Sequence, residues 1–189
     1  NSFGAAVSLS GDGKTLAVGA YGEKSLGQGP NQNPLSNQTA VLTVGAVFTF
    51  AMTGDASFTS WTQTSLIKAS NAQSNNQFGN SVTLSYDGLT LAVGDSAERS
   101  TSQGINGNQT QSGVLGSGAV YVLSRPISSF VWTQDAYIKA GNSATGFAFG
   151  ASVSLDASGQ NLLVGASFEG GNSTGVFQGS QNAQQDALF

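Results

Sequence analysis

The chain repeats itself, and this self-similarity constrains its fold more than any other feature. Three stretches align almost without adjustment, and each opens with a Phe-Gly pair that recurs after 75 and then 71 residues. The pairs are Phe3-Gly4, Phe78-Gly79 and Phe149-Gly150. A fixed period of this kind predicts that one structural unit is used several times along the chain.

Two further blocks recur between the Phe-Gly stretches. Residues 45–50 match residues 118–123, and residues 61–69 match residues 132–140. Val, Leu, Phe, Tyr and Thr dominate these blocks, and parts of them alternate with period two, which is typical of β-strands. Helix signals are missing. We therefore predict an all-β protein with four strand-like blocks in each full repeat.

A tight turn joins the first two blocks of each repeat. Its last two residues are Asp12-Gly13, Asp87-Gly88 or Ser158-Gly159. Such pairs supply the positive φ of a short hairpin, so the two flanking strands are expected to be antiparallel neighbours.

These blocks resemble the FG-GAP repeats of integrin α-subunit heads and of many bacterial surface proteins. The later Gly-Ala-Pro of that family is present only as Gly19-Ala20, Gly94-Asp95 and Gly165-Ala166, without the proline. The resemblance implies β-propeller blades of four antiparallel strands. On this reading residues 1–75 are the first repeat, 76–146 the second and 147–189 the first half of a third, which is roughly two and a half blades. A closed propeller needs about 4 to 8 blades. We therefore expect a segment of a longer chain, or strands supplied by other copies.

The composition excludes several classes of function. Charged residues are only 8% of the chain and the net charge is −4, so no basic surface for nucleic acid is expected. Cysteine and histidine are absent, and no apolar run approaches the length of a membrane span. A Ser nucleophile would need a Lys base in a context that the chain does not offer. Asp95 with Glu98 could form a glycosidase pair, but we expect them to be solvated surface acids. No enzyme activity is predicted.

Calcium is the cation that the resemblance suggests, because integrin-type repeats often carry a carboxylate-rich loop between the first two strands. Here the turns offer only Asp12, Asp87 or Asp156 with Ser158. Ca²⁺ usually takes six to eight oxygen ligands. We therefore expect plain hairpins and no cofactor, with calcium as the alternative.

Three glutamates fall in register, each four residues after the glycine that ends the second strand-like block. They are Glu23, Glu98 and Glu169. They could contact a ligand, one in each blade, or they could anchor their loop by accepting backbone N–H bonds or by pairing with Lys68 and Lys139. A residue repeated in every unit usually serves the unit itself. We favour the anchor.

Repeated aromatic residues and sequons also have two interpretations. Trp61 and Trp132 could stack on sugars, but their strict repeat position favours packing between blades, as it does for Phe3, Phe78 and Phe149. Asn37, Asn108 and Asn172 begin N-glycosylation sequons in the long loops, although a chain this rich in Asn, Ser and Thr would contain about three by chance.

The sequence thus predicts a non-catalytic, extracellular or cell-surface repeat module for adhesion or surface assembly, which acts through long amide-rich loops at residues 21–43 and 96–117. Its expected partners are further repeats of the same chain or other copies, together with a protein or glycan ligand. A carbohydrate-binding propeller and a structural subunit of an extracellular filament or coat are the alternatives.

Overall fold

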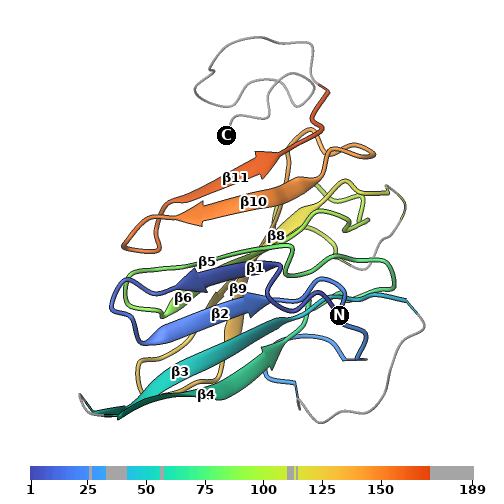
Figure 1. The fold of residues 1–189 in the computed structure, drawn as a ribbon. Coiled ribbons are helices and arrows are strands. Elements are labelled where there is room, and N and C mark those ends of the chain that lie inside the picture. Colours follow the sequence, from blue (N-terminus) through green and yellow to red (C-terminus); the bar gives the residue numbers. More distant parts are fainter. Residues whose placement is uncertain (26, 33–41, 56–57, 110–112, 114, 171–189) are drawn as a thin grey trace.

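A computed structural model describes the chain except for residues 26, 33–41, 56–57, 110–112, 114 and 171–189 (Figure 1). The described residues form eleven β-strands and no helix, arranged in three antiparallel sheets. The all-β prediction is confirmed. Nothing in the described part of the chain is a helix that could cross a membrane.

The first sheet contains the four strands that the first repeat predicted. Their order in the sheet is β1-β2-β3-β4. The strands are β1 (Ala6–Leu9), β2 (Thr15–Gly19), β3 (Val47–Asp55) and β4 (Phe58–Ile67). The hairpin of β3 and β4 extends beyond β2, because the pairing of β2 with β3 ends at Thr15 and Ala51.

The second sheet repeats this plan with one added strand, and the described residues of the third repeat supply its first two strands. The second has the order β5-β6-β8-β9-β7 and the third contains β10 and β11. The strands are β5 (Ser81–Leu84), β6 (Thr90–Asp95), β7 (Gly104–Ile105), β8 (Ala119–Ser124), β9 (Thr133–Lys139), β10 (Phe149–Leu155) and β11 (Leu162–Ala166).

Strand β7 is a feature that the repeat pattern did not predict. The long loop of the second repeat folds back, so that Gly104 pairs with Lys139 and Ile105 with Ile138 on the outer strand. The first repeat does the same with fewer residues, since Lys68 N donates to Gly29 O at 3.0 Å. Both long loops are therefore tied to the outer strand of their own sheet.

The turns between the first two strands have the geometry that their residues predict. Gly13, Gly88 and Gly159 have φ of 72°, 66° and 71°. In the first turn Asp12 Oδ1 accepts hydrogen bonds from Ser10 Oγ at 2.6 Å and from Lys14 N at 3.0 Å. The carboxylate therefore holds the turn closed, as Asp and Asn often do in such loops.

The second sheet lies between the other two, because β5 contacts both β1 and β10 (Figure 1). The Phe-Gly pair of each later repeat makes the junction. Phe78 forms a parallel bridge with Gly45 of the first repeat, and Phe149 forms one with Gly118 of the second. Both rings are 1% exposed. The Phe-Gly motif is therefore the contact through which one repeat packs on the preceding one.

Glycines at the ends of β2 and β6 permit this close packing. A Cβ atom on Gly19 would fall far inside 3.0 Å of the carbonyl oxygen of Gly79, and one on Gly94 would meet Gly150 O in the same way. Real Cβ atoms do not approach that closely. Glycine is needed here because the backbone of the next repeat occupies the place of a side chain.

Two aromatic residues do not pack between repeats as predicted. Phe3 is 55% exposed, and its ring contacts Phe48 of its own sheet, with centroids 5.3 Å apart. The described residues contain no earlier sheet for Phe3 to pack against. Trp61 is 43% exposed because it pairs with Met52, in the part of the β3–β4 hairpin that extends beyond β2. Trp132, in contrast, is only 2% exposed.

Candidate functional site at the junction of the first two repeats

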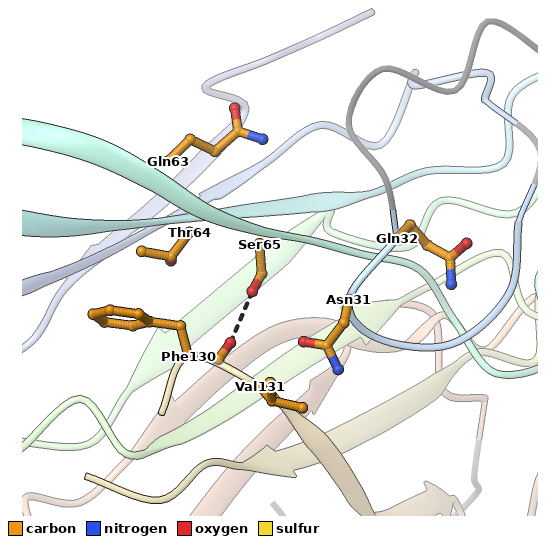
Figure 2. A pocket seen from close by; sticks show the side chains of 7 residues that line it. All are labelled: Asn31, Gln32, Gln63, Thr64, Ser65, Phe130 and Val131. Carbon is orange, nitrogen blue, oxygen red and sulfur yellow. Dashed lines mark hydrogen bonds between the residues drawn. The ribbon is translucent and has the colours of Figure 1, made fainter. Parts of the chain in front are cut away.

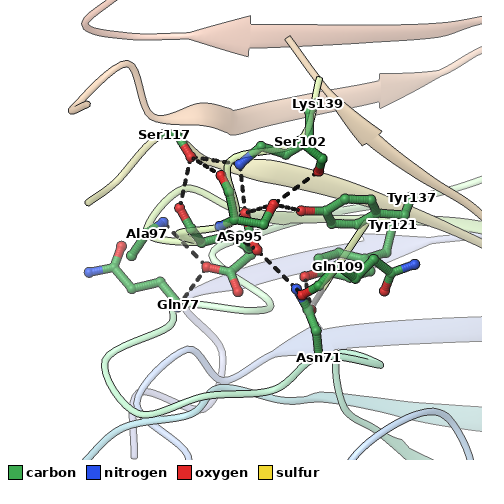
Figure 3. Close-up of polar contacts among 12 residues, drawn as sticks. Asn71, Gln77, Asp95, Ala97, Ser102, Gln109, Ser117, Tyr121, Tyr137 and Lys139 are labelled. Carbon is green, nitrogen blue, oxygen red and sulfur yellow. Dashed lines mark hydrogen bonds and ion pairs between the residues drawn. The ribbon is translucent and has the colours of Figure 1, made fainter. Parts of the chain in front are cut away.

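A buried ion pair lies at the centre of the second repeat (Figure 3). Lys139 Nζ donates to Glu98 Oε2 at 2.6 Å and to Ser117 Oγ at 2.6 Å. The lysine side chain is 0% exposed and the glutamate side chain 3%. Glu98 also accepts a hydrogen bond from Ser100 N at 2.9 Å. Burial lowers the pKa of Lys139, and Glu98 opposes that shift.

The first repeat contains the same pair in a more open form. Lys68 Nζ contacts Glu23 Oε2 and donates to Gly45 O at 2.8 Å. Burial alone would raise the pKa of Glu23, but the hydrogen bonds from Lys68 and Ser25 lower it overall. In both repeats a glutamate from the long loop therefore meets the lysine at the end of the outer strand. In the third repeat Glu169 accepts from Asn142 Nδ2 at 2.9 Å.

The second repeat extends its ion pair into a larger polar network. Asn71, which follows the last strand of the first repeat, donates to Glu98 Oε1 at 2.9 Å and accepts from Tyr121 Oη at 2.6 Å. Tyr137 Oη contacts Ser100 Oγ. Both tyrosines are 0% exposed, and burial raises the pKa of each. The network therefore joins the first repeat to the second through uncharged donors.

Asp95 is a buried acid at the edge of this network. It is 0% exposed, and its Oδ1 accepts from Gln77 N at 2.8 Å and from Ala97 N at 3.3 Å. Its Oδ2 is buried without a hydrogen-bond partner among the described residues. Burial raises the pKa of Asp95 to about 7. The prediction that Asp95 and Glu98 are solvated surface acids is wrong, since both are buried where the loops of the second repeat converge.

Replacement of Asp95 by Asn is expected to remove a pH dependence of stability. The pKa of Asp95 in the folded state is about 7, above the ordinary value of 3.8. The stability that this carboxyl contributes is therefore fully present below about pH 3.8 and is lost as the pH rises towards 7. The loss approaches about 1.4 kcal/mol per pH unit below the folded-state pKa and amounts to about 1.6 kcal/mol between about pH 5.5 and about pH 7. Denaturant unfolding at both pH values checks this, and equal pH slopes for the two proteins would contradict it.

An open groove lies above the network, where the first repeat meets the loop of the second. We call it the rim groove. Two adjoining cavities of about 470 and 430 Å³ form it and share Gln28 and Gln73. Asn71 and Gln109 line the larger cavity. The hydrogen bonds from Asn71 to Glu98 and from Tyr121 to Asn71 fix this part of the lining. Amides therefore line a groove with an immobilised polar layer beneath it.

A smaller pocket of about 180 Å³ lies between β4 and the segment that leads into β9 (Figure 2). Ser65 Oγ donates to Phe130 O at 2.9 Å, and Asn31 Oδ1 accepts from Trp132 N at 2.9 Å. These two bonds hold the walls together. The ring of Phe130 is 49% exposed, and Gln63 is exposed beside it. The pocket therefore combines an apolar ring with amide groups.

The turn carboxylates are engaged within their own turns. Asp87 Oδ1 accepts from Ser85 Oγ at 2.7 Å and from Leu89 N at 3.0 Å. Asp156 accepts from Ser158 Oγ at 2.8 Å and from Asn161 Nδ2 at 2.7 Å. In the described ranges no group of three or more acidic residues could hold a metal ion. The three aspartates, Asp12 included, are thus separated, one to each turn.

The sequons fall only partly within the described residues. Asn108 is exposed in the loop between β7 and β8. Asn37 and Asn172 lie outside the described residues. Glycosylation at these positions stays a prediction.

The repeat pattern predicted the glutamates but not the residues that surround them. Ser25 and Ser100 occupy equivalent positions two residues after the glutamate, and both donate to it. That shared Glu-x-Ser spacing was a signal in the sequence that could have been used. Asn71 also recurs, since Asn71 and Asn142 each follow a lysine by three residues and donate to Glu98 and Glu169. Tyr121 had no such signal, because only the packing of one repeat on the next brings it to Asn71.

A comparison with protein-family models agrees with this architecture. Residues 61–123, from the middle of β4 to the end of β8, match the family model of the FG-GAP repeat. The chain therefore contains an FG-GAP repeat, and the predicted resemblance is confirmed. The match implies a propeller-like fold, in keeping with the open antiparallel sheets. No curated protein matches the chain.

Proposed function

We propose that this chain is a non-catalytic, extracellular repeat module that recognises a partner through the rim groove, in adhesion or in surface assembly. Its sheets are successive propeller blades, and the described residues of the third supply two strands. The observation that carries the proposal is the groove itself, which is lined by neutral amides and is fixed from below by a buried ion pair.

The chemistry of the groove favours binding over catalysis. Gln28 and Gln73 are exposed there, whereas Glu98 and Lys139 beneath it are buried and paired with each other. An acid and a base in such a pair have no access to a substrate. An amide offers both donors and an acceptor, so the groove suits a neutral polar partner. FG-GAP repeats are typically extracellular, which supports the proposed location.

The test uses fluorescently labelled chain and cells of the organism that encodes it. Binding is measured by flow cytometry, and we expect the double variant Gln28→Ala, Gln73→Ala to weaken it at least fivefold. Gln160→Ala is the matched control, because Gln160 is exposed at a turn in the third sheet, away from the groove. Equal binding by the double variant and the wild type would rule out the groove as the recognition site.

Carbohydrate binding is the second candidate, and the smaller pocket favours it. The half-exposed ring of Phe130 beside Gln63 is an apolar face with amides next to it, an arrangement suited to a sugar ring. A panel of immobilised neutral oligosaccharides separates the two candidates. Binding to the panel that Phe130→Ala abolishes would support this pocket, whereas cell binding without any panel binding would favour a protein partner at the rim groove.

A further inference from the structure

The two junctions between repeats share one design. Ser8 Oγ on β1 accepts a hydrogen bond from Leu84 N at 3.0 Å. Thr83 Oγ1 on β5, at the equivalent position of the second repeat, accepts one from Leu155 N at 3.2 Å. Together with the Phe-Gly contact and the glycine at the end of the second strand, this bond recurs at both junctions. Each junction therefore joins a receiving face on one sheet to a docking face on the next.

The third sheet carries a receiving face that no described residue covers. Ser154 occupies the position of Ser8 and Thr83, and it is exposed. Leu163 is 66% exposed, whereas Ala17 and Ala92 at the equivalent positions are 0% exposed. A groove of about 240 Å³ crosses this face and includes Gly165 in its lining. The receiving face of β10 and β11 is thus formed and apolar.

The first sheet carries the complementary docking face, also uncovered in the described part of the chain. Val7 and Leu9 on β1 are 64% and 56% exposed. Their equivalents in the second repeat, Val82 and Leu84, are 8% and 7% exposed because the first sheet covers them. These differences measure the apolar surface that docking removes from water.

The docking face already has its docked backbone conformation. Gly4 has φ of +88°, and Gly79 and Gly150 in the two formed junctions have +88° and +86°. At Gly4 an added Cβ would meet nothing within 4 Å, whereas at the two docked glycines it would meet backbone of the preceding repeat. The conformation therefore does not depend on a partner, and docking needs no refolding of this segment.

We propose that the receiving face of the third sheet binds the docking face of a second copy of this chain, head to tail. The contact continues the two junctions within the chain, and Val7, Leu9, Ser154 and Leu163 bring no charge into it. A contact between two different faces leaves one of each free at the ends, so association proceeds beyond a dimer or closes into a ring. This inference does not depend on the rim groove.

The experiment blocks each face separately with a charge at an exposed position. Analytical ultracentrifugation is performed on the wild type, on Val7→Glu, on Leu163→Glu and on their mixture. We expect the wild type to associate with increasing concentration and each variant to raise the dissociation constant at least tenfold. The mixture should form a one-to-one dimer and nothing larger, because one intact face of each kind remains. Ile127→Glu, at a position 85% exposed outside both faces, should associate like the wild type.

The mixture also shows that the variants are folded, since two misfolded chains could not restore one specific contact. A wild type that sediments at 19.1 kDa at every concentration would overturn the proposal. So would association that persists in both variants alone. Cell binding through the rim groove is measured separately, so either proposal can fail without the other.

Discussion

Replacement of Glu98 by Ala is expected to lower the free energy of unfolding by about 3–5 kcal/mol. The substitution leaves the ammonium of Lys139 buried with only Ser117 Oγ as its remaining side-chain partner. It also removes one of the two acceptors of Asn71 Nδ2, the other being Gln109 O. Loss of one partner of a buried ion pair is costly because the other charge stays out of water. Thermal unfolding should show a midpoint lower by about 10 °C, at about 2–4 °C per kcal/mol for a chain of this size.

The same substitution at Glu169 is the matched control. Glu169 holds the equivalent position in the third repeat, where it is partly exposed and accepts a hydrogen bond from Asn142, the counterpart of Asn71. We expect Glu169→Ala to cost about 1–2 kcal/mol, clearly less than Glu98→Ala, because Glu169 is partly exposed and Glu98 is buried. If both variants lost the same stability, the idea that the glutamate and its lysine anchor the loop would have to be abandoned.

Replacement of Gly94 by Val is expected to be at least as disruptive, with a loss of about 4 kcal/mol or more in the free energy of unfolding. The new side chain would occupy the position of the Gly150 carbonyl, which is backbone and cannot rotate away. The third sheet would have to separate from the second, which exposes Phe149 and the apolar residues around it. Hydrogen exchange of the β10 amides should therefore become faster even where the chain still folds.

Gly165→Ala provides the comparison for that variant. Gly165 is the second-last residue of β11, as Gly94 is of β6. Its added Cβ would meet chiefly the Ser152 side chain, which can change rotamer. A small effect at Gly165 beside a large one at Gly94 is the expected pattern. The reverse would show that the close approach of Gly150 does not hold the two sheets together.

Much of the fold could be predicted from the sequence because the same strand pattern occurs three times along the chain. Alternating apolar residues and Asp-Gly turns are local signals, and they located the strands of the first two repeats. The pairing of glutamates with Lys68 and Lys139 was likewise readable from register. Strand β7 was not, because its two residues, Gly104 and Ile105, are too few to show alternation and pair only once the loop has folded back.

The candidate site was harder to predict because it depends on packing between repeats. Asn71 belongs to the first repeat, yet its partners Glu98 and Tyr121 belong to the second. Trp61 shows the opposite difficulty. It shares its repeat position with Trp132, but Trp61 lies on the part of the β3–β4 hairpin that extends beyond β2, whereas Trp132 is buried. Equal position in a repeat therefore does not guarantee equal surroundings.

The fold-back of the loop in the second repeat has a consequence for solubility. Strand β9 would be the edge of its sheet, but β7 pairs with its last residues, Ile138 and Lys139. Unpaired edges of β-sheets are the places where unrelated chains add strands and aggregate. Shortening this loop to simplify the protein for crystallisation would uncover that edge, so a trimmed variant should precipitate more readily than the parent.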